Sequence, residues 1–347
     1  MLIFAVESSC DETAICLMRS NGSVLSHKIA SQDIHSKFGG VVPELASRSH
    51  LTNIQQLYID CINESGVNIA DIDAFCATCG PGLIGSLLVG STFTKSLSIG
   101  LKKPFYPINH LEGHILSPTI NNNIKFPFLC LLLTGGHTQI YFVKNINEYL
   151  LLGETIDDAI GEAFDKVAKL LKLPYPGGPE IEKAAKNGDK NSILLPHPLK
   201  KDKKLQFSFS GIKTAVSLVI KKNNLNINKE LVKNIAASFQ HTVSEILNKK
   251  TNLCINKIKK SSPDIKQLAI VGGVAINNYL RTGLEKVCKQ NNIELISPPK
   301  NMFGDNAAMI AWACIKKLQK GDFKENIYFK ADPRLQITQK INEILVS

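Results

Sequence analysis

Apolar segments separated by short polar turns occur in the same order in the two halves of the chain. The first half contains three such segments, at residues 2–9, 13–20 and 23–31. The second half repeats them at residues 126–134, 138–144 and 148–156. Each has the length and composition of a β-strand, and the Asn21-Gly22 pair is typical of a tight hairpin turn. The pattern predicts two antiparallel units of three strands each.

Helical periodicity follows each three-stranded unit, at residues 42–66 in the first half and 157–173 in the second. The second segment carries one apolar stripe, formed by Ala159, Ala163, Phe164, Val167, Leu170 and Leu171. Further along each half, an apolar strand leads through glycines into a helix, starting at residue 73 and at residue 267. Two copies of this order describe an α/β protein with a duplicated ribonuclease-H-like, two-lobed fold.

The duplication also predicts how the chain is divided. We expect the lobe boundary near residues 106–125, with lobes and tail at 1–110, 111–330 and 331–347. The last helical segment, 305–320, is expected to cross back to the first lobe, and 184–206 is expected to be a long loop. In this fold a nucleotide binds between the lobes, and the tight turn after the first strand of each copy can hold phosphate groups with backbone N–H donors.

The composition excludes few classes of function. Hydrophobic residues make up 44% and charged residues 20%, as in an ordinary globular protein. No stretch approaches the roughly 18 consecutive apolar residues of a membrane span, and the chain enters its first strand without a charged leader, so we expect a cytoplasmic protein with no membrane association. The nine cysteines lie mostly in apolar segments, and the Cys76-x-x-Cys79 pair has no second pair to complete a zinc site.

The formal net charge of +11 permits a polyanionic partner. The basic residues are nearly all lysine, however, and the clusters at 200–204 and 257–260 can equally be solvated faces. Charge alone therefore leaves nucleic-acid binding open.

The stretch NHLEGH, residues 109–114, carries two histidines four residues apart. On a helix His110 and His114 share a face and can bind one metal ion. A zinc peptidase needs a glutamate next to one of them, whereas Glu112 is two residues from both and points roughly 160° away from that face. A third ligand must come from elsewhere, and Asp305, at the start of an apolar helical segment, is a plausible donor.

Several turns have the composition of ligand-binding loops. Asp11 and Glu12 fall in the turn after the first strand. The strand that ends near Thr134 is followed by two glycines, which let the backbone approach a ligand closely. Further glycine turns precede helices at 174–183 and 271–278. Each can be a simple turn, but their matching places in a duplicated fold favour a nucleotide site.

Ten motifs occur in the order found in one family, and the chain resembles that family over roughly residues 2–335. The family is that of the tRNA N6-adenosine threonylcarbamoyltransferases, once labelled O-sialoglycoprotein endopeptidases. The motifs are ESSCDET, FGGVVPELASRSH, GPGLIGSLLVG, NHLEGH, LLTGGHTQ, GEAFDKVAKLL, YPGGP, FSFSGIKT, GGVAINNYLR and DNAAMIA. The resemblance implies an actin- and sugar-kinase-like fold, in agreement with the duplication.

The resemblance also implies an activity and a site. The threonylcarbamoyl group would pass from threonylcarbamoyl-adenylate to N6 of adenosine 37 in tRNAs that read codons starting with A, which forms N6-threonylcarbamoyladenosine (t6A). His110, His114 and Asp305 would bind one divalent metal ion per subunit, iron(II) by first choice and zinc as the alternative. The adenylate would be held by Leu133, Thr134, Gly135, Gly136, His137, Asp165, Gly178, Glu182 and Asn277.

Three positions depart from the family pattern in small ways: Glu182 stands where some members have aspartate, Thr134 replaces a frequent serine, and Asn109 replaces a frequent histidine. The donor is already an activated mixed anhydride, so no covalent nucleophile is required. Some group must accept the N6 proton, and Asp11 or Glu12 is the candidate by position.

The resemblance also implies partner proteins, and other functions have to be weighed against the transferase activity. Bacterial family members pair with a smaller paralogue of the same fold and a P-loop ATPase, and residues 42–56 are the expected docking surface. An ATP-dependent phosphotransferase of the same fold is the main alternative, and it would not need the metal pair. A metallopeptidase fails on the position of Glu112, and a scaffold without activity would not explain the glycine turns together with the metal ligands.

Overall fold

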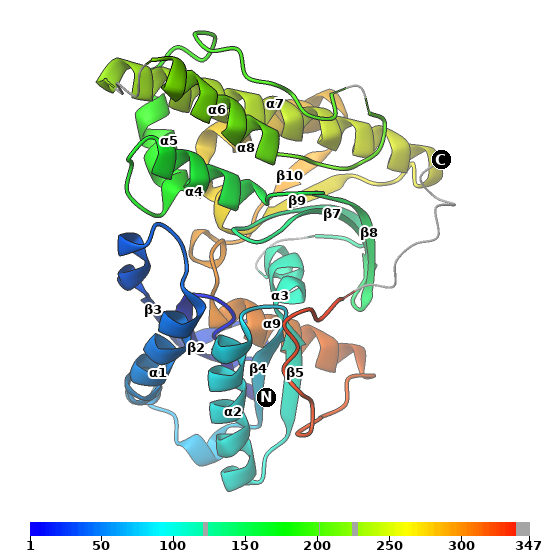
Figure 1. The fold of residues 1–347 in the computed structure, drawn as a ribbon. Helices are drawn as coiled ribbons and strands as arrows, with labels where there is room; N and C mark the ends of the chain where they lie inside the picture. The colour runs from blue at the N-terminus through cyan, green and yellow to red at the C-terminus, as the bar shows by residue number, and fades with distance from the viewer. Residues whose placement is uncertain (121–123, 201, 224–227, 338–347) are drawn as a thin grey trace. The chain divides into compact units, whose positions relative to one another are not determined.

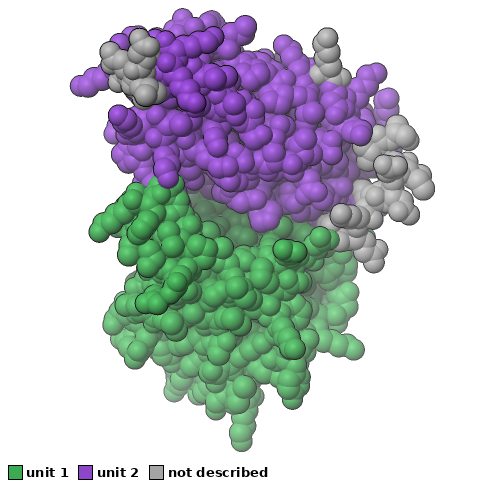
Figure 2. All heavy atoms as spheres, viewed as in Figure 1, with its two compact units in different colours: residues 1–123, 146–148, 298–338 green, residues 124–145, 149–297, 339–347 purple. Residues whose placement is uncertain are grey.

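The computed structural model describes residues 1–120, 124–200, 202–223 and 228–337 (Figure 1). These residues form two compact units, shown in different colours in Figure 2. Of the described residues, unit 1 contains 1–120, 146–148 and 298–337, and unit 2 contains those of 124–145 and 149–297.

The first division of the chain falls within the expected boundary region, 106–125, but the units differ in their limits from lobes at 1–110 and 111–330. The first boundary lies beyond residue 120 because helix α3 (His110–Leu116) continues directly from the last strand of unit 1 and packs on helix α9 (Ala307–Lys320). Helix α9 contacts strands β1 and β2 and belongs to unit 1, as expected for a helix that crosses back.

The sheet of unit 1 has five strands in the order β3-β2-β1-β4-β5. Strand β1 is antiparallel to β2 and parallel to β4, and β4 is parallel to β5. The strands are β1 (Leu2–Glu7), β2 (Glu12–Arg19), β3 (Val24–Ser31), β4 (Ala74–Gly80) and β5 (Phe105–Asn109).

Helices cover both faces of this sheet. Alternation along β1 turns Leu2, Phe4 and Val6 toward a core shared with α1 (Pro43–Ser65). Side chains of α2 (Ile84–Leu101) pack against the same core. The other face, which takes the alternate positions of β1, is covered by α9. Glu7 continues this second series, so its side chain lies on the face of the sheet that α9 covers.

The sheet of unit 2 repeats the strand order of the first, β8-β7-β6-β9-β10. Its antiparallel pair β6–β7 and its parallel pair β6–β9 correspond to β1–β2 and β1–β4. The strands are β6 (Phe128–Leu133), β7 (Thr138–Asn145), β8 (Glu148–Glu154), β9 (Gln267–Val271) and β10 (Glu294–Ile296). The predicted duplication is therefore confirmed.

Five helices of unit 2 pack on one another (Figure 1). They are α4 (Ile160–Leu170), α5 (Gly177–Ala185), α6 (Ser210–Lys222), α7 (Lys229–Ser261) and α8 (Asn278–Gln290). The α4 stripe is buried as predicted, except for the half-buried Leu170. No helix or strand is assigned among the described residues between α5 and α6, which agrees with the predicted long loop.

The cysteines and the helices carry two smaller results. All nine cysteines are free thiols, and burial raises the pKa of Cys79 to about 12, which fits a small apolar residue rather than a nucleophile. Over the described ranges, none of the helices combines the length and the apolar character needed to span a bilayer.

Candidate metal centre and active-site residues

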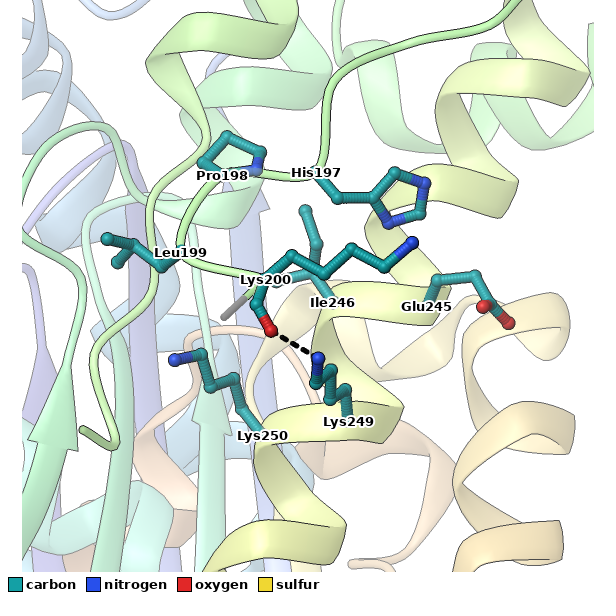
Figure 3. A pocket seen from close by; sticks show the side chains of 8 residues that line it. All are labelled: His197, Pro198, Leu199, Lys200, Glu245, Ile246, Lys249 and Lys250. Atoms are coloured by element: carbon teal, nitrogen blue, oxygen red, sulfur yellow. Dashed lines mark hydrogen bonds between the residues drawn. The ribbon is translucent and has the colours of Figure 1, made fainter. Parts of the chain in front are cut away.

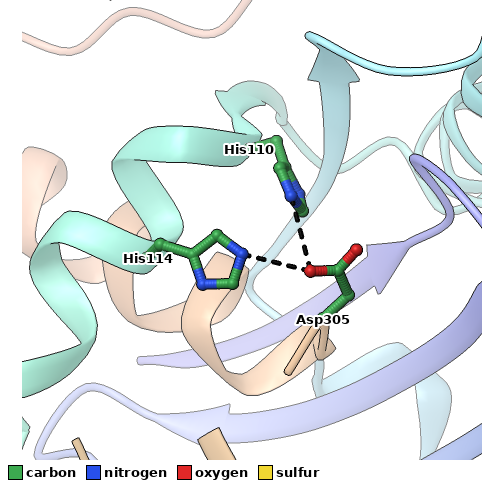
Figure 4. Close-up of side chains that lie close together, drawn as sticks. All are labelled: His110, His114 and Asp305. Carbon is green, nitrogen blue, oxygen red and sulfur yellow. Dashed lines mark hydrogen bonds and ion pairs between the residues drawn. The ribbon is translucent and has the colours of Figure 1, made fainter. Parts of the chain in front are cut away.

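Two histidines and one aspartate from distant parts of the sequence converge in unit 1 (Figure 4). Asp305 Oδ1 lies 3.1 Å from Nε2 of His114 and 3.5 Å from Nε2 of His110. One potential ligand atom from each residue falls within 4.8 Å of the others. The predicted trio is thus brought together, with the two Nε2 atoms and a carboxylate oxygen facing a common point.

Local capping fixes the helix that carries the histidines. Asn109 ends β5, and its Oδ1 accepts the N–H groups of Leu111 at 2.9 Å and Glu112 at 3.4 Å. Its Nδ2 donates to the carbonyl of Leu335 at 3.1 Å, which ties the helix start to the segment after α9. The Asn109 side chain therefore caps α3 and also anchors its start to residue 335.

Capping also fixes the aspartate. Asn306 is the N-cap of α9, where its side chain accepts the N–H of Met309 at 2.9 Å, and Asp305 directly precedes it. Gly113 allows α3 to lie close to α9, because a Cβ there would meet the side chain of Ile310 at 2.9 Å. The distance between the aspartate and the histidines is therefore set by backbone packing.

The donor set fits a divalent transition metal. Two imidazoles and one carboxylate, with positions left over for substrate or water, suit iron(II) or zinc and are poorly suited to magnesium or calcium. His114 is fully buried, and within the part of the chain that the structure describes its Nδ1 has no hydrogen-bond partner. A buried, aligned set of this kind is costly unless a cation compensates the carboxylate, so the residues present fit a metal centre.

The same charges predict how metal binding depends on pH. Burial alone would lower the pKa of His110, but Asp305 and Glu7 raise it to about 9. A metal binds only the neutral imidazole, so below pH 9 His110 must lose a proton when the metal binds. The apparent metal affinity should therefore rise by up to about tenfold per pH unit until about pH 9. Competition with a chromophoric chelator at pH 7, 8 and 9 measures this, corrected for the chelator's own titration. A pH-independent affinity would contradict it.

Glu112 cannot serve the histidines as a peptidase base. Its buried carboxylate lies 2.8 Å from Nζ of Lys317 on α9. This ion pair joins α3 to α9 and occupies the carboxylate, in agreement with the expectation from its position in the sequence.

The two acidic residues of the first turn lie in the same unit as the metal trio. Burial raises the pKa of Glu12 well above its usual value, and repulsion from Asp305 and Asp11 adds to the shift. Glu12 also forms a side-chain hydrogen bond with Asp11. A buried carboxyl group with a raised pKa beside other carboxylates is a candidate acid–base group.

The predicted substrate residues all lie in unit 2. After β6, the N–H of His137 donates to Thr134 Oγ1 at 2.9 Å, which closes the turn. Gly135 and Gly136 face open space, since a Cβ on either would meet nothing within 4 Å. The backbone of the turn is therefore uncovered at both glycines. A Cβ on Gly161, at the start of α4, would lie 2.7 Å from Gly135 Cα, so this helix begins against the turn.

The side chains of Asp165 and Glu182 each accept a hydrogen bond from a backbone N–H group. Asp165 accepts the N–H of Gly177 at 2.7 Å, and Glu182 accepts the N–H of Asn278 at 2.9 Å. Gly178, between them, faces open space.

Asn277 is already engaged at both ends of its amide. Its Oδ1 caps α8 through Leu280, and its Nδ2 donates to Gln240 Oε1 at 2.9 Å. One N–H and one lone pair are left for a ligand.

Gly272 joins the end of β9 to the Thr134 turn and should tolerate no side chain. Its φ is +93°, and a Cβ would fall well inside contact distance of the Leu133 carbonyl. We expect Gly272→Ala to lower the free energy of unfolding by about 3 kcal/mol, because strain and overpacking add. Gly273→Ala is the matched control, since a Cβ there meets nothing within 4 Å. Urea denaturation of both variants measures the difference, and equal stabilities would refute the prediction.

Three residues beside the metal trio were not predicted. Glu7, Ser9 and Thr78 form a hydrogen-bonded group around Nδ1 of His110. The available signal was an acidic residue at the end of a strand that is otherwise apolar, because a charge in such a place needs partners.

Two comparisons with solved structures define the class of the fold. Full-length HypF, in a phosphate- and nucleotide-bound form, matches 93% of this chain and 47% of its own length with a TM-score of 0.59 and 14% identity. Component A of the Acidaminococcus fermentans (R)-2-hydroxyglutaryl-CoA dehydratase matches 92% and 99% with a TM-score of 0.54 and 14% identity. At this identity the likeness concerns the fold alone: a duplicated α/β fold of the actin and sugar-kinase type.

Comparison with known sequences gives the family. The family model for tRNA N6-adenosine threonylcarbamoyltransferase matches residues 23–312. The enzyme of that name from Rickettsia massiliae is 48% identical over 91% of this chain and 92% of its own, and that from Wolbachia of Brugia malayi is 43% identical over 96% and 98%. The chain belongs to the tRNA N6-adenosine threonylcarbamoyltransferase family and is a transferase of tRNA modification.

Proposed function

We propose that this protein transfers the threonylcarbamoyl group from threonylcarbamoyl-adenylate to N6 of adenosine 37 in tRNA, with the help of a divalent metal ion. The observation that supports the proposal most directly is the convergence of His110, His114 and Asp305 in a chain of this family. We propose iron(II) as the metal, with zinc as the alternative, because the donor set suits both.

The reaction needs positioning more than it needs new covalent chemistry. The N6 nitrogen bonds to the carbamoyl carbon, the bond from that carbon to the phosphate oxygen breaks, and AMP departs with the electron pair. A bound metal would supply Lewis-acid stabilisation of the developing negative charge. The open backbone at Gly135, Gly136 and Gly178 would hold the adenylate, and Asp165, Glu182 and Asn277 would fix the elements around it.

The N6 proton must be accepted as the new bond forms. We propose that the Asp11–Glu12 pair takes it, because the two side chains are hydrogen-bonded to each other and the raised pKa of Glu12 makes its carboxylate a stronger base than an ordinary one.

Part of the tRNA contact is assigned to a basic hollow in unit 2 (Figure 3). The cavity of about 60 Å³ is lined by His197, Pro198, Leu199, Lys200, Glu245, Ile246, Lys249 and Lys250. Lys250 is buried and donates to the carbonyls of Asp202 and Lys204 at 3.1 and 2.7 Å. These bonds hold residues 202 and 204 against α7, and Lys200, Lys249 and Lys250 together line the hollow, where their positive charge suits a phosphate backbone.

Lys200→Ala is therefore expected to weaken tRNA binding and to reduce its salt dependence. Loss of one phosphate contact lowers the slope of log affinity against log salt by about 0.7–0.9. The measurement is a filter-binding titration with unmodified tRNA at salt concentrations from about 50 to about 200 mM. Lys28→Ala is the control, because Lys28 is paired with Glu64 at 2.9 Å on β3. Equal slopes for both variants would show that the hollow is not part of the surface that contacts tRNA.

We propose the same partners that the family resemblance implies. A smaller paralogue of the same fold would dock on α1, where Leu51 is 64% exposed within the expected segment 42–56. A P-loop ATPase would join the complex, and a separate enzyme would make the adenylate. The cytoplasmic location stays a prediction that rests on the tRNA substrate.

The test supplies the donor directly. Purified protein loaded with iron(II) or zinc is mixed with threonylcarbamoyl-adenylate labelled in threonine and a tRNA transcript carrying adenosine 37, with and without the two partner proteins. The matched control is the same transcript with guanosine 37. Label in the first tRNA and not in the second is the expected result.

No label under any partner combination would overturn the proposal. ATP consumption with a small hydroxyl substrate, unaffected by loss of the metal, would then favour the phosphotransferase of the same fold.

A further inference from the structure

Glu7 is a carboxylate with 0% exposure at the end of the central strand of unit 1. It follows Ile3 and Ala5 on the face of β1 that α9 covers, where the strand pattern calls for an apolar residue. A buried charge in such a position is costly unless each oxygen finds a donor, so its partners show what it does.

Three donors surround the carboxylate. Oε1 accepts the backbone N–H of Ser9 at 2.6 Å, and Oε2 accepts the hydroxyl of Thr78 from the neighbouring strand β4. Oε2 also lies 3.2 Å from Nδ1 of His110. Two fixed donors therefore hold Glu7 in place, and its second oxygen is presented to the imidazole.

This contact determines which imidazole nitrogen carries the proton. An ionised carboxylate can only accept, so Nδ1 of His110 must donate. In the neutral ring the lone pair then lies on Nε2, the nitrogen that is 3.5 Å from Asp305 Oδ1 and faces the metal point. Ser9 Oγ, 3.1 Å from the same Nδ1, can donate or accept and cannot impose this choice alone.

We infer that Glu7 is a positioning residue that fixes His110 in the tautomer and ring orientation required for metal binding through Nε2. The inference rests on the proposed metal role of His110. The second histidine offers an internal contrast, because among the described residues Nδ1 of His114 has no hydrogen-bond partner. Its ring contacts Asp305 through Nε2, whereas the ring of His110 is also oriented by a carboxylate at Nδ1.

The sharpest test compares Glu7→Gln with the native protein. A glutamine side chain keeps the size of glutamate, but its amide can present either an oxygen or an N–H to Nδ1, so the tautomer is no longer fixed. Outer carboxylates of this kind typically contribute about 10- to 100-fold to metal affinity. We expect Glu7→Gln to weaken cobalt(II) and zinc binding by about that factor in a chelator competition, and to alter the visible spectrum of the cobalt(II) form.

Two further measurements separate positioning from stability. Nitrogen-15 NMR of the metal-free protein above pH 9 should show Nδ1-protonated His110 in the native chain and a mixture of tautomers in Glu7→Gln. Thr78→Val is the matched variant: it removes one donor to Glu7 but leaves the contact with His110, and should retain most of the metal affinity. If Glu7→Gln does not fold, Glu7→Asp, which retracts the carboxylate from Nδ1, takes its place in the same assays.

The outcomes distinguish this inference from the proposed function. Native protein that binds no divalent metal would refute the metal role itself. Native protein that binds metal, with Glu7→Gln binding equally tightly and showing the same tautomer, would refute the positioning role and leave the proposed function intact.

Discussion

His114→Ala is expected to abolish tight metal binding and to slow threonylcarbamoyl transfer on the order of 1,000-fold. The substitution removes one of three donors from a centre in which His114 is fully buried and 3.1 Å from Asp305. Lewis-acid stabilisation contributes several kcal/mol to a transition state of this kind, and each 1.36 kcal/mol corresponds to about a factor of ten in rate.

The experiment measures metal content and single-turnover transfer in the same samples. Native protein stripped with a chelator should behave like His114→Ala, and adding iron(II) or zinc back should restore only the native protein. Thermal melting of both metal-free proteins checks that the variant is folded. Full transfer by the stripped native protein would contradict a metal-assisted mechanism while leaving the transferase activity in place.

The fold was largely predictable because its signals are local. Strand alternation and the 21–22 turn describe the first triplet, and the second copy repeats the pattern, so the two sheets with matching strand order follow from periodicity. The boundary region 106–125 and the return of 305–320 to the first lobe were also predicted, from the duplication. The exact limits of each unit were not, because residues 111–120 join unit 1 through the packing of α3 on α9, and such packing leaves no local signal.

The residues of the candidate site also differ in whether local sequence signals predict them. The spacing of His110 and His114 is a helical periodicity and can be read directly, whereas Asp305 was placed by family resemblance and by its position before a helix. Glu7 shows what is missed: the sequence contains the buried acid, but its partner lies 103 residues away and depends on the parallel and antiparallel neighbours of β1. Side-chain hydrogen bonds between distant elements are tertiary information.

The second large effect is expected for the carboxyl pair of the first turn. Removal of the base, by Glu12→Gln or by Asp11→Asn, should slow transfer by about 10²- to 10⁴-fold, the usual contribution of a positioned base, while adenylate affinity stays nearly unchanged in both variants. The reason is that neither residue belongs to the predicted adenylate-binding set, all of which lies in unit 2. Adenylate binding is measured by calorimetry with a non-hydrolysable analogue, and transfer by single turnover at saturating donor.

The pH profile identifies which of the two accepts the proton. A base acts in its deprotonated form. Burial, with repulsion from Asp305 and Asp11, raises the pKa of Glu12. The rate of the native protein should therefore rise with pH over a higher pH range than the pKa of an ordinary carboxyl group would give. If Glu12 is the base, Glu12→Gln removes this climb. Asp11→Asn removes a negative neighbour and should shift the climb to lower pH without abolishing it. The reverse pattern would make Asp11 the base, and loss of adenylate binding in Asp11→Asn would instead place that residue among the groups that hold the donor.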